Sequence, residues 1–398
     1  MASIRKLLTS LYTSTPAQMR VIFRPAQIIL RNVFIQRIKL WSLRGHELNS
    51  KQEMSILYAG QEGNMNYFIG LAFDGKCEVK YIGTCWLFNL SKIAKSESDI
   101  YSILVAELPR FLVLNLKNSF QIPCWVRGEV DISGDIAAIM KKTDSLQSAA
   151  RNIKKNSLYY EITNDEAKFH DFYYNMYLPY ITKRYDNAAA IEPYELFKSH
   201  FHHCDLLLIK SKNQVIAGGL ICYEWGKVRL WSFGINDANP EYVQMGAFGA
   251  LYFFSLQYLK DKGFLKVGLG GSRPFLNNGV IVYKKRWGLK LTEPFEINYL
   301  LKPLKITNES KSFLINNPFI FTEKGKFNCA VMMNEQFSID ADVAEDLNHK
   351  YYYPGINTIN VFSFKDKEMI LVGRVPGKAT LAKVKVKRIQ QTKNVPSP

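Results

Sequence analysis

The sequence predicts an α/β protein built from two similar units, each with a mixed, mostly antiparallel sheet flanked by helices, and a small C-terminal α/β extension. Three observations support this class. The chain has 398 residues, more than a single hydrophobic core usually holds. Apolar residues make up 47% of it and aromatic residues 13%, as in packed globular proteins. Strand-like and helix-like stretches follow one another in an order that occurs twice between residues 47 and 302.

Residues 1–46 are predicted to form a basic amphipathic helical arm. Apolar residues recur there at roughly helical spacing among arginines, and Pro16 and Pro25 interrupt the pattern. Such an arm lies either at a membrane interface or against its own protein, and the sequence leaves both alternatives open. Neither a run of eighteen apolar residues nor a signal-peptide pattern is found. We therefore expect a cytoplasmic protein, with peripheral attachment at the inner face of the membrane as a further expectation.

The positive charge is concentrated at the two ends of the chain. The formal net charge is +17, but residues 1–45 carry eight Lys and Arg and no acid, and residues 374–398 carry seven and no acid. The long segment between them has a net charge of only +2. The ends therefore supply the field that attracts phosphates or anionic lipid.

Residues 47–145 are predicted to form the first α/β unit. A turn is expected at Asp74 and Gly75, where glycine adopts a positive φ at little cost. The expected elements are two strands over 66–88, a helix over about 99–117 and a strand over 122–132.

Residues 146–302 are predicted to repeat this order at greater length. Asn164 or Asp165 is placed to cap a helix that runs toward Pro179, and Gly263 is placed to end a long apolar helix. The other expected elements are a basic helix over 145–156, a strand over 158–162, a helix from Pro193, three meander strands over 205–235, the apolar helix over 247–263 and a strand over 264–271.

Residues 303–398 are predicted to form the C-terminal extension with its basic tail. Strands are expected near 327–333, 359–364 and 368–375, around a helix that Ser338 or Asp340 starts. This part of the sequence does not indicate a purpose.

The cysteines and histidines do not indicate a disulfide framework or a metal site. The six cysteines are scattered without a C-x-x-C pair, which predicts reduced thiols. Residues 200–205 gather three histidines and a cysteine, as zinc sites do. However, His202 and His203 are adjacent and point apart on a helix, and no second cluster supplies further ligands. A structural use is expected for these histidines, and no metal is predicted.

Two glycine-containing stretches are the candidate binding sites. Gln244, Gly246 and Gly249 stand at the start of the apolar helix, where free N–H groups and the helix dipole bind anions. Gly270 and Gly271 end the following strand, where ligands commonly bind in α/β proteins. The first stretch is therefore expected to hold the phosphates of a substrate.

The motifs of residues 146–302 resemble those of GNAT acyltransferases, and within that superfamily of the FemAB-like group, which tends to carry two GNAT-like domains in tandem. The resemblance is carried by SAARNIKKN (148–156), the region of Arg184, LGGSRPFLNNGV (269–280) and YKKRWG (283–288). It implies a FemAB-like domain over 146–302 and a degenerate GNAT-like copy over 47–145. One departure is visible, because the usual motif has two residues between Arg or Gln and the first Gly, whereas only Met245 separates Gln244 from Gly246.

The resemblance implies an N-acyltransferase of cell-envelope or polysaccharide biosynthesis. Its donor would be acyl-CoA, such as acetyl-CoA, or aminoacyl-tRNA, and its acceptor the amine of an amino sugar or of a glycan or peptide precursor. Gly271, Ser272 and Arg273 would line the cleft, with Arg273 offering a planar fork to phosphate or carboxylate. Tyr283 and Lys284 match the aromatic-lysine pair of FemAB-like proteins, whose cation is implied to stabilise either the acyl carbonyl or an anionic acceptor as charge develops. Tyr283 is alternatively the proton donor to the leaving group.

The base that removes a proton from the attacking amine is left open among four carboxylates, Asp171, Glu192, Glu195 and Asp205. For Glu192 and Glu195 the simpler interpretation is that they serve the dipole of the helix that begins beside them. Because no Ser-His-Asp or Cys-His spacing is found, direct attack on the carbonyl is expected. The competing hypothesis is a GNAT-shaped scaffold without activity that binds membrane or nucleic acid, tRNA included, through its basic ends.

Overall fold

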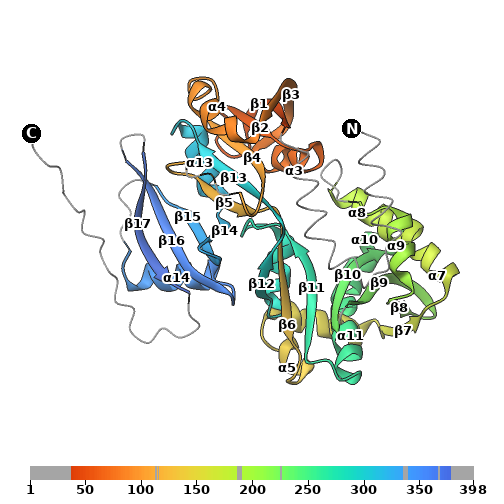
Figure 1. Cartoon of the computed structure of the whole chain (residues 1–398). Coiled ribbons are helices and arrows are strands. Elements are labelled where there is room, and N and C mark those ends of the chain that lie inside the picture. Colours follow the sequence, from red (N-terminus) through yellow and green to blue (C-terminus); the bar gives the residue numbers. More distant parts are fainter. Residues whose placement is uncertain are drawn as a thin grey trace, which may run out of the picture.

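The computed structural model describes residues 37–112, 114, 116–185, 191–224, 226–334, 339–365 and 368–377. These residues form a mixed α/β protein with three mostly antiparallel sheets flanked by helices (Figure 1), which confirms the predicted class. Most of the predicted arm, Ser338 and the basic tail after Gly377 lie outside the described residues.

Sheet A has six strands in the order β3-β1-β2-β4-β13-β5. Helices α3 (Glu62–Ala72) and α4 (Leu90–Ser96) follow β2 and β3 in the chain. The strands are β1 (Arg37–Glu47), β2 (Glu53–Ala59), β3 (Phe73–Trp86), β4 (Ile103–Pro109), β5 (Phe120–Pro123) and β13 (Ile297–Pro303).

Three expectations for this region are wrong. Residues 37–46 were expected in the helical arm, but they are strand, with Ile38 and Leu40 buried in alternation. Residues 62–72 form a helix instead of the first half of a hairpin, and the buried Met65, Phe68 and Ala72 follow a helical period. A helix was expected over 99–117, but residues 103–109 of this range form the strand β4, which is buried in the middle of the sheet. A short apolar run buried on both faces has no period that distinguishes the two structures.

Sheet B has seven strands in the order β12-β6-β11-β10-β9-β8-β7 and agrees closely with the predictions for 146–302. Asp165 caps α7, Gly263 has φ +86° after α11, and Lys212 and Asn213 form the first meander turn with positive φ. The strands are β6 (Val126–Asp131), β7 (Tyr159–Thr163), β8 (Cys204–Ser211), β9 (Gln214–Glu224), β10 (Lys227–Ile235), β11 (Lys266–Ser272) and β12 (Lys290–Pro294).

The helices of this region cover sheet B. They are α5 (Ile136–Met140), α6 (Asp144–Lys155), α7 (Glu166–Asp171), the π-helical turn η2 (Phe172–Tyr177), α8 (Leu178–Tyr185), α9 (Tyr194–Phe201), α10 (Pro240–Gln244), α11 (Ala247–Asp261) and α12 (Gly279–Arg286).

Sheet C is the C-terminal sheet, drawn in blue in Figure 1, with the order β14-β15-β16-β17. Helix α13 (Asn308–Asn316) precedes it, and α14 (Ala341–Tyr351) starts at the predicted cap Asp340. The strands are β14 (Phe319–Glu323), β15 (Lys326–Met332), β16 (Ile356–Lys365) and β17 (Glu368–Pro376).

Sheets A and B are joined by two strand pairs that pass from one sheet to the other. β5 lies in sheet A and β6 in sheet B, separated by Cys124 and Trp125. In the same way β12 lies in sheet B and β13 in sheet A. At the crossing, the Phe295 N–H donates to the Trp125 carbonyl at 3.0 Å. Both sheets thus combine strands from the predicted ranges 47–145 and 146–302.

Candidate active site

The two parallel strands β10 and β11 separate after a single registered pair, Arg229 with Gly268. Each strand has an irregularity there, β10 between Leu230 and Ser232 and β11 between Gly268 and Gly271. Gly270 has φ +71°, and a Cβ on it would lie 3.0 Å from the Leu230 carbonyl oxygen. Only glycine fits this position comfortably, because another residue would be strained there and its Cβ would press on the Leu230 carbonyl.

Lys284 places its ammonium group at this separation. It lies on α12, which Asn278 caps by accepting from the Val280 N–H. Its Nζ donates to the Gly271 carbonyl at 2.8 Å and to Ser272 Oγ at 3.1 Å. The side chain is buried, and this burial lowers the pKa of Lys284 to about 7. The structure therefore brings together three of the residues singled out in the sequence, Gly271, Ser272 and Lys284.

Tyr283 packs against the first turns of α11 instead. Its ring lies 5.6 Å from that of Phe248 and 5.3 Å from that of Tyr252. Burial raises the pKa of Tyr283 to about 12, so the hydroxyl keeps its proton at neutral pH. Tyr283 and Lys284 are neighbours on one helix, and their side chains contact different groups.

Arg273 is buried, and its hydrogen bonds go to other residues than those of Lys284. Its guanidinium lies between the rings of Tyr67 and Trp125, at 4.2 and 4.0 Å from their centroids. It donates to Asn64 Oδ1 at 3.0 Å and to the Tyr299 hydroxyl at 2.8 Å. In this structure the fork expected to bind phosphate or carboxylate is engaged by residues of sheet A and α3.

A partly buried carboxyl group, Glu107 on β4, completes this cluster. It accepts from the Tyr58 hydroxyl at 2.6 Å, the Gln61 N–H at 2.8 Å and Asn64 Nδ2 at 3.1 Å. Burial raises the pKa of Glu107, although these hydrogen bonds and the charge of Arg273 oppose the rise. Sequence reasoning missed Glu107, whose one signal was a lone acid inside the apolar run of β4.

The two glycines that were predicted to bind the phosphates of a donor, Gly246 and Gly249, lie against helix α6. A Cβ on Gly246 would lie 2.8 Å from the Cβ of Asn152, and one on Gly249 would lie 2.8 Å from the Cβ of Ala149. Asn152 also donates to the Gln244 carbonyl at 3.4 Å. The absence of side chains at Gly246 and Gly249 thus serves close packing of α6 on α11, and their role toward a donor stays a prediction.

Glu192 stands out among the four candidate bases. It precedes α9, which begins at Tyr194. The hydroxyl of Tyr173 donates to its carbonyl at 2.9 Å, and its own N–H donates to the hydroxyl of Tyr177 at 3.0 Å, so its backbone is held on both sides. Burial raises the pKa of Glu192, while the charges of Arg229 and His200 oppose the rise.

The other candidates have different surroundings. Asp205 accepts hydrogen bonds from Tyr223, Tyr258 and Lys262 at 2.6, 2.7 and 3.0 Å. Burial alone would raise the pKa of Asp205, but these hydrogen bonds outweigh it and hold the pKa below its usual value. Glu195 lies exposed in the first turn of α9, as the simpler interpretation expected.

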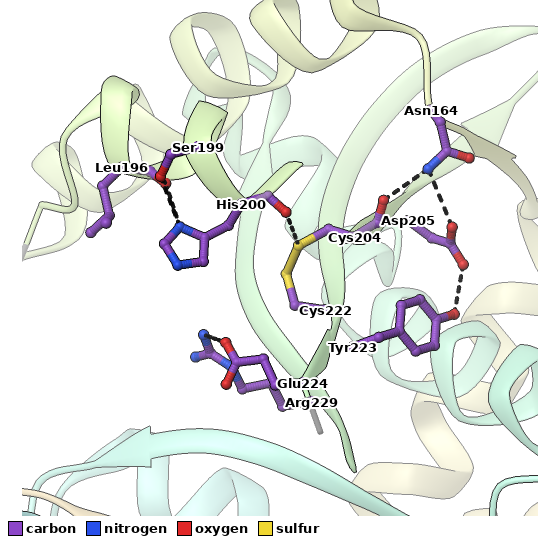
Figure 2. The surroundings of a disulfide bond; sticks show 10 residues. All are labelled: Asn164, Leu196, Ser199, His200, Cys204, Asp205, Cys222, Tyr223, Glu224 and Arg229. Carbon is purple, nitrogen blue, oxygen red and sulfur yellow. Dashed lines mark hydrogen bonds and ion pairs between the residues drawn. A yellow bond between two sulfur atoms is a disulfide. The ribbon is translucent and has the colours of Figure 1, made fainter. Parts of the chain in front are cut away.

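A disulfide corrects the prediction that all cysteines are reduced. Cys204 on β8 and Cys222 on β9 are directly opposite each other and form a disulfide bond (Figure 2). Their pairing depends on strand register, which spacing along the chain does not reveal. Cys77, Cys85, Cys124 and Cys329 are free thiols. In the described part of the chain, no group of three His, Cys, Asp or Glu is arranged to hold a metal ion.

No helix among the described residues is both long and apolar enough to cross a membrane. No model of a protein family matches the sequence, and neither does any curated protein.

Several solved structures are similar to this chain. One is FemX, with 11% identity over 62% of this chain and 80% of FemX, and a TM-score of 0.35. Another is L-PGS from Bacillus licheniformis, with 11% identity over 63% of this chain and 78% of that protein, and a TM-score of 0.32. A third is a GCN5-related N-acetyltransferase from Anabaena variabilis, with 10% identity over 81% and 74% and a TM-score of 0.25. The FemAB-like and GNAT proteins that the motifs resemble are thus among its structural neighbours.

Proposed function

We propose that this protein is an N-acyltransferase that moves an acyl or aminoacyl group from a thioester or a tRNA ester to an amine. The observation that carries the proposal is the buried ammonium group of Lys284 at the separation of β10 and β11, bonded to Gly271 and Ser272. A lysine is seldom buried without a functional or structural reason, because burial disfavours its charge.

Lys284 has the chemistry to activate a carbonyl group. An ammonium group has three N–H donors, and two of them are used by Gly271 and Ser272. The third is then directed to the donor's carbonyl oxygen, where it stabilises the negative charge that develops as the amine attacks. Since the pKa of Lys284 is about 7, the same group gives a proton to the departing thiolate or ribose oxygen near neutral pH.

Glu192 is the proposed base on the acceptor side. Glu192 and Lys284 are linked through β10 and β11. The charge of Arg229 on β10 acts on Glu192, and Arg229 is paired with Gly268 on β11. Gly270, two residues further along β11, lies beside Lys284. A carboxylate whose pKa is raised is a better proton acceptor than an ordinary glutamate. As the N–C bond forms and the C–S or C–O bond breaks, the amine's proton passes to Glu192, and Lys284 protonates the leaving group.

The partners follow from the same proposal. The acceptor is the amine of an amino sugar or of a cell-envelope precursor, and the donor is acyl-CoA or aminoacyl-tRNA with its phosphates near the start of α11. The basic ends of the chain hold the enzyme at the inner face of an anionic membrane or contact tRNA.

Transfer assays on paired variants test the proposal. Acetyl-CoA, longer acyl-CoA and charged tRNA are each supplied with a panel of amino sugars and peptide amines. Lys284→Gln is expected to lower kcat/KM about 100-fold or more, because one donor to the oxyanion is lost. The matched control Lys290→Gln, an exposed lysine on β12, is expected to keep full activity. Undiminished turnover in a folded Lys284→Gln variant would remove Lys284 from the mechanism.

A second pair tests the base. Glu192→Gln is expected to lower kcat and to remove the acidic limb of the pH profile, whereas Glu195→Gln, an exposed neighbour, leaves both unchanged. Equal effects of the two substitutions would reject Glu192 as the base.

The alternative is a scaffold without activity, and one observation favours it. Helix α6 lies against Gly246 and Gly249, where a donor's phosphates were expected. Thermal unfolding with each donor distinguishes the two functions, since a ligand that binds the folded state raises its stability. No shift with any donor, together with no turnover, would support the scaffold.

A further inference from the structure

A cavity of about 440 Å³ lies beside the end of β13, the loop before α13 and the start of β17. Its wall includes Asn118, Lys302, Lys305, Thr307 and Glu368, and it shares no residue with the site around Lys284. This volume is within the usual range for small-molecule sites. The cavity therefore has room for a ligand that neither the sequence nor the proposed reaction assigned to it.

Two lysines, Lys302 and Lys305, bring positive charge to the cavity. Lys302 Nζ donates to the backbone carbonyl of Lys117 at 2.7 Å, and Lys305 Nζ donates to the backbone carbonyl of Asp99 at 2.5 Å. Both acceptors are neutral, so these hydrogen bonds hold the ammonium groups in place without cancelling their charge. Among the described residues, neither lysine forms an ion pair with a carboxylate.

Lysines outnumber carboxylates among the described residues of the cavity wall. Lys117 adds a third positive charge near Lys302, and among the described residues of the wall Glu368 is the one carboxylate. A second carboxylate, Glu309, lies next to the wall residue Thr307 and accepts from the hydroxyls of Ser102 and Thr307. Burial and the nearby charge of Lys117 together lower the pKa of Lys302. A bound anion would oppose both effects on the pKa of Lys302, because it stabilises the charged form.

We propose that this cavity binds a diphosphate group, either free or as part of an ester, through Lys302 and Lys305. Lysine ammonium groups bind phosphate oxygens as point charges, and two of them suit the two phosphates of a diphosphate. Thr307, the N-cap residue of α13, belongs to the same wall. The proposal does not depend on the role of Lys284.

Calorimetric titration of the full chain at near-physiological salt tests this assignment. Inorganic diphosphate, inorganic phosphate and uridine diphosphate are the three probes, and they distinguish a free anion from an ester. Diphosphate is expected to bind the unchanged protein. Lys302→Gln and Lys305→Gln are each expected to weaken it about 10-fold or more, since each removes one hydrogen bond to a charged group.

Two controls keep the result interpretable. Lys92→Gln changes an exposed lysine on α4 and is expected to leave the affinity within about 2-fold, because surface charges contribute little at this salt. Lys284→Gln is also expected to keep diphosphate binding, which separates this site from the proposed reaction. Thermal unfolding without anion verifies that each variant folds. No binding to the unchanged protein, or equal losses in Lys302→Gln and Lys92→Gln, would overturn the assignment.

Discussion

At the scale of single residues, the buried lysine of the proposed site couples protonation to folding. Lys284 has a folded pKa of about 7 against an ordinary value of 10.5. Below pH 7 it is charged in both states, so the unfavourable burial of its charge is fully present. Between pH 7 and 10.5 the unfolded chain binds the proton more tightly, and the free energy of unfolding therefore rises with pH.

The Lys284→Met substitution is expected to remove this rise. The free energy of unfolding of the unchanged protein should increase by at most about 1.4 kcal/mol per pH unit between pH 7 and 10.5, relative to the variant. Urea unfolding at a series of pH values measures the two slopes, with Lys290→Met as the control that keeps the original slope. Parallel curves for the unchanged protein and Lys284→Met would contradict the assignment of a lowered pKa.

The sequence predicted some of these residues better than others. Gly271, Ser272 and Lys284 lie within one 20-residue stretch, so the local pattern of strand, turn and helix was sufficient to place them together. Arg273 belongs to the same stretch, but its partner Asn64 is 209 positions away in the sequence and its acceptor at Cys124 is 149 positions away. No local pattern reports such contacts, which is why the buried cluster with Glu107 was missed.

At the scale of secondary-structure elements, the packing of α6 on α11 explains why Gly246 and Gly249 have no side chains. The sequence pattern predicted a ligand site at these two glycines. Gly249 allows the contact because no Cβ separates it from Ala149. The elements of residues 146–302 were predictable because caps, turns and helical periods are local signals, as at Asp165 and Gly263. The strand β4 was not, because both of its faces are buried and its sequence has no period.

The Gly249→Ala substitution tests this contact. The added methyl group would lie 2.8 Å from the Cβ of Ala149, so α6 has to move. We expect the free energy of unfolding to fall by about 1–3 kcal/mol, as in other overpacked sites. Gly70→Ala on α3 is the control, because no atom lies within 4 Å of its added Cβ. In the control, helix propensity alone should raise stability by about 0.5–1 kcal/mol. Chemical denaturation that shows a gain for both variants would reject close packing at Gly249.

At the scale of the whole molecule, Arg273 connects the end of β11 in sheet B to α3 and to sheet A. Its hydrogen bonds to Asn64 and Tyr299 and its stacking between Tyr67 and Trp125 all cross between the two parts. The sequence offers no signal for this connection, since strands 120–131 and 290–303 pair over a long separation and each passes from one sheet to the other.

The Arg273→Met substitution is expected to destabilise the protein by about 1.5–3 kcal/mol, because it removes the charged hydrogen bonds to Asn64 and Tyr299. It also removes a positive charge that acts on Glu107. Urea unfolding measures the change, and Arg110→Met, an exposed arginine after β4, should change it by less than about 0.5 kcal/mol. Adding Glu107→Gln to Arg273→Met should restore part of the loss. Strictly additive effects of these two substitutions would show that Arg273 and Glu107 are not coupled.

The position of β13 between β4 and β5 has a consequence for synthesis on the ribosome. Sheet A begins with the first described residues, yet its interior strand is translated only at residues 297–303. Until then β4 is an open edge of the sheet and β5 has no partner strand in it, and both invite association with other chains. Separate expression of the halves before and after residue 145 would leave each half without strands that the other supplies, and recovery of a native fold would require both halves to be made together.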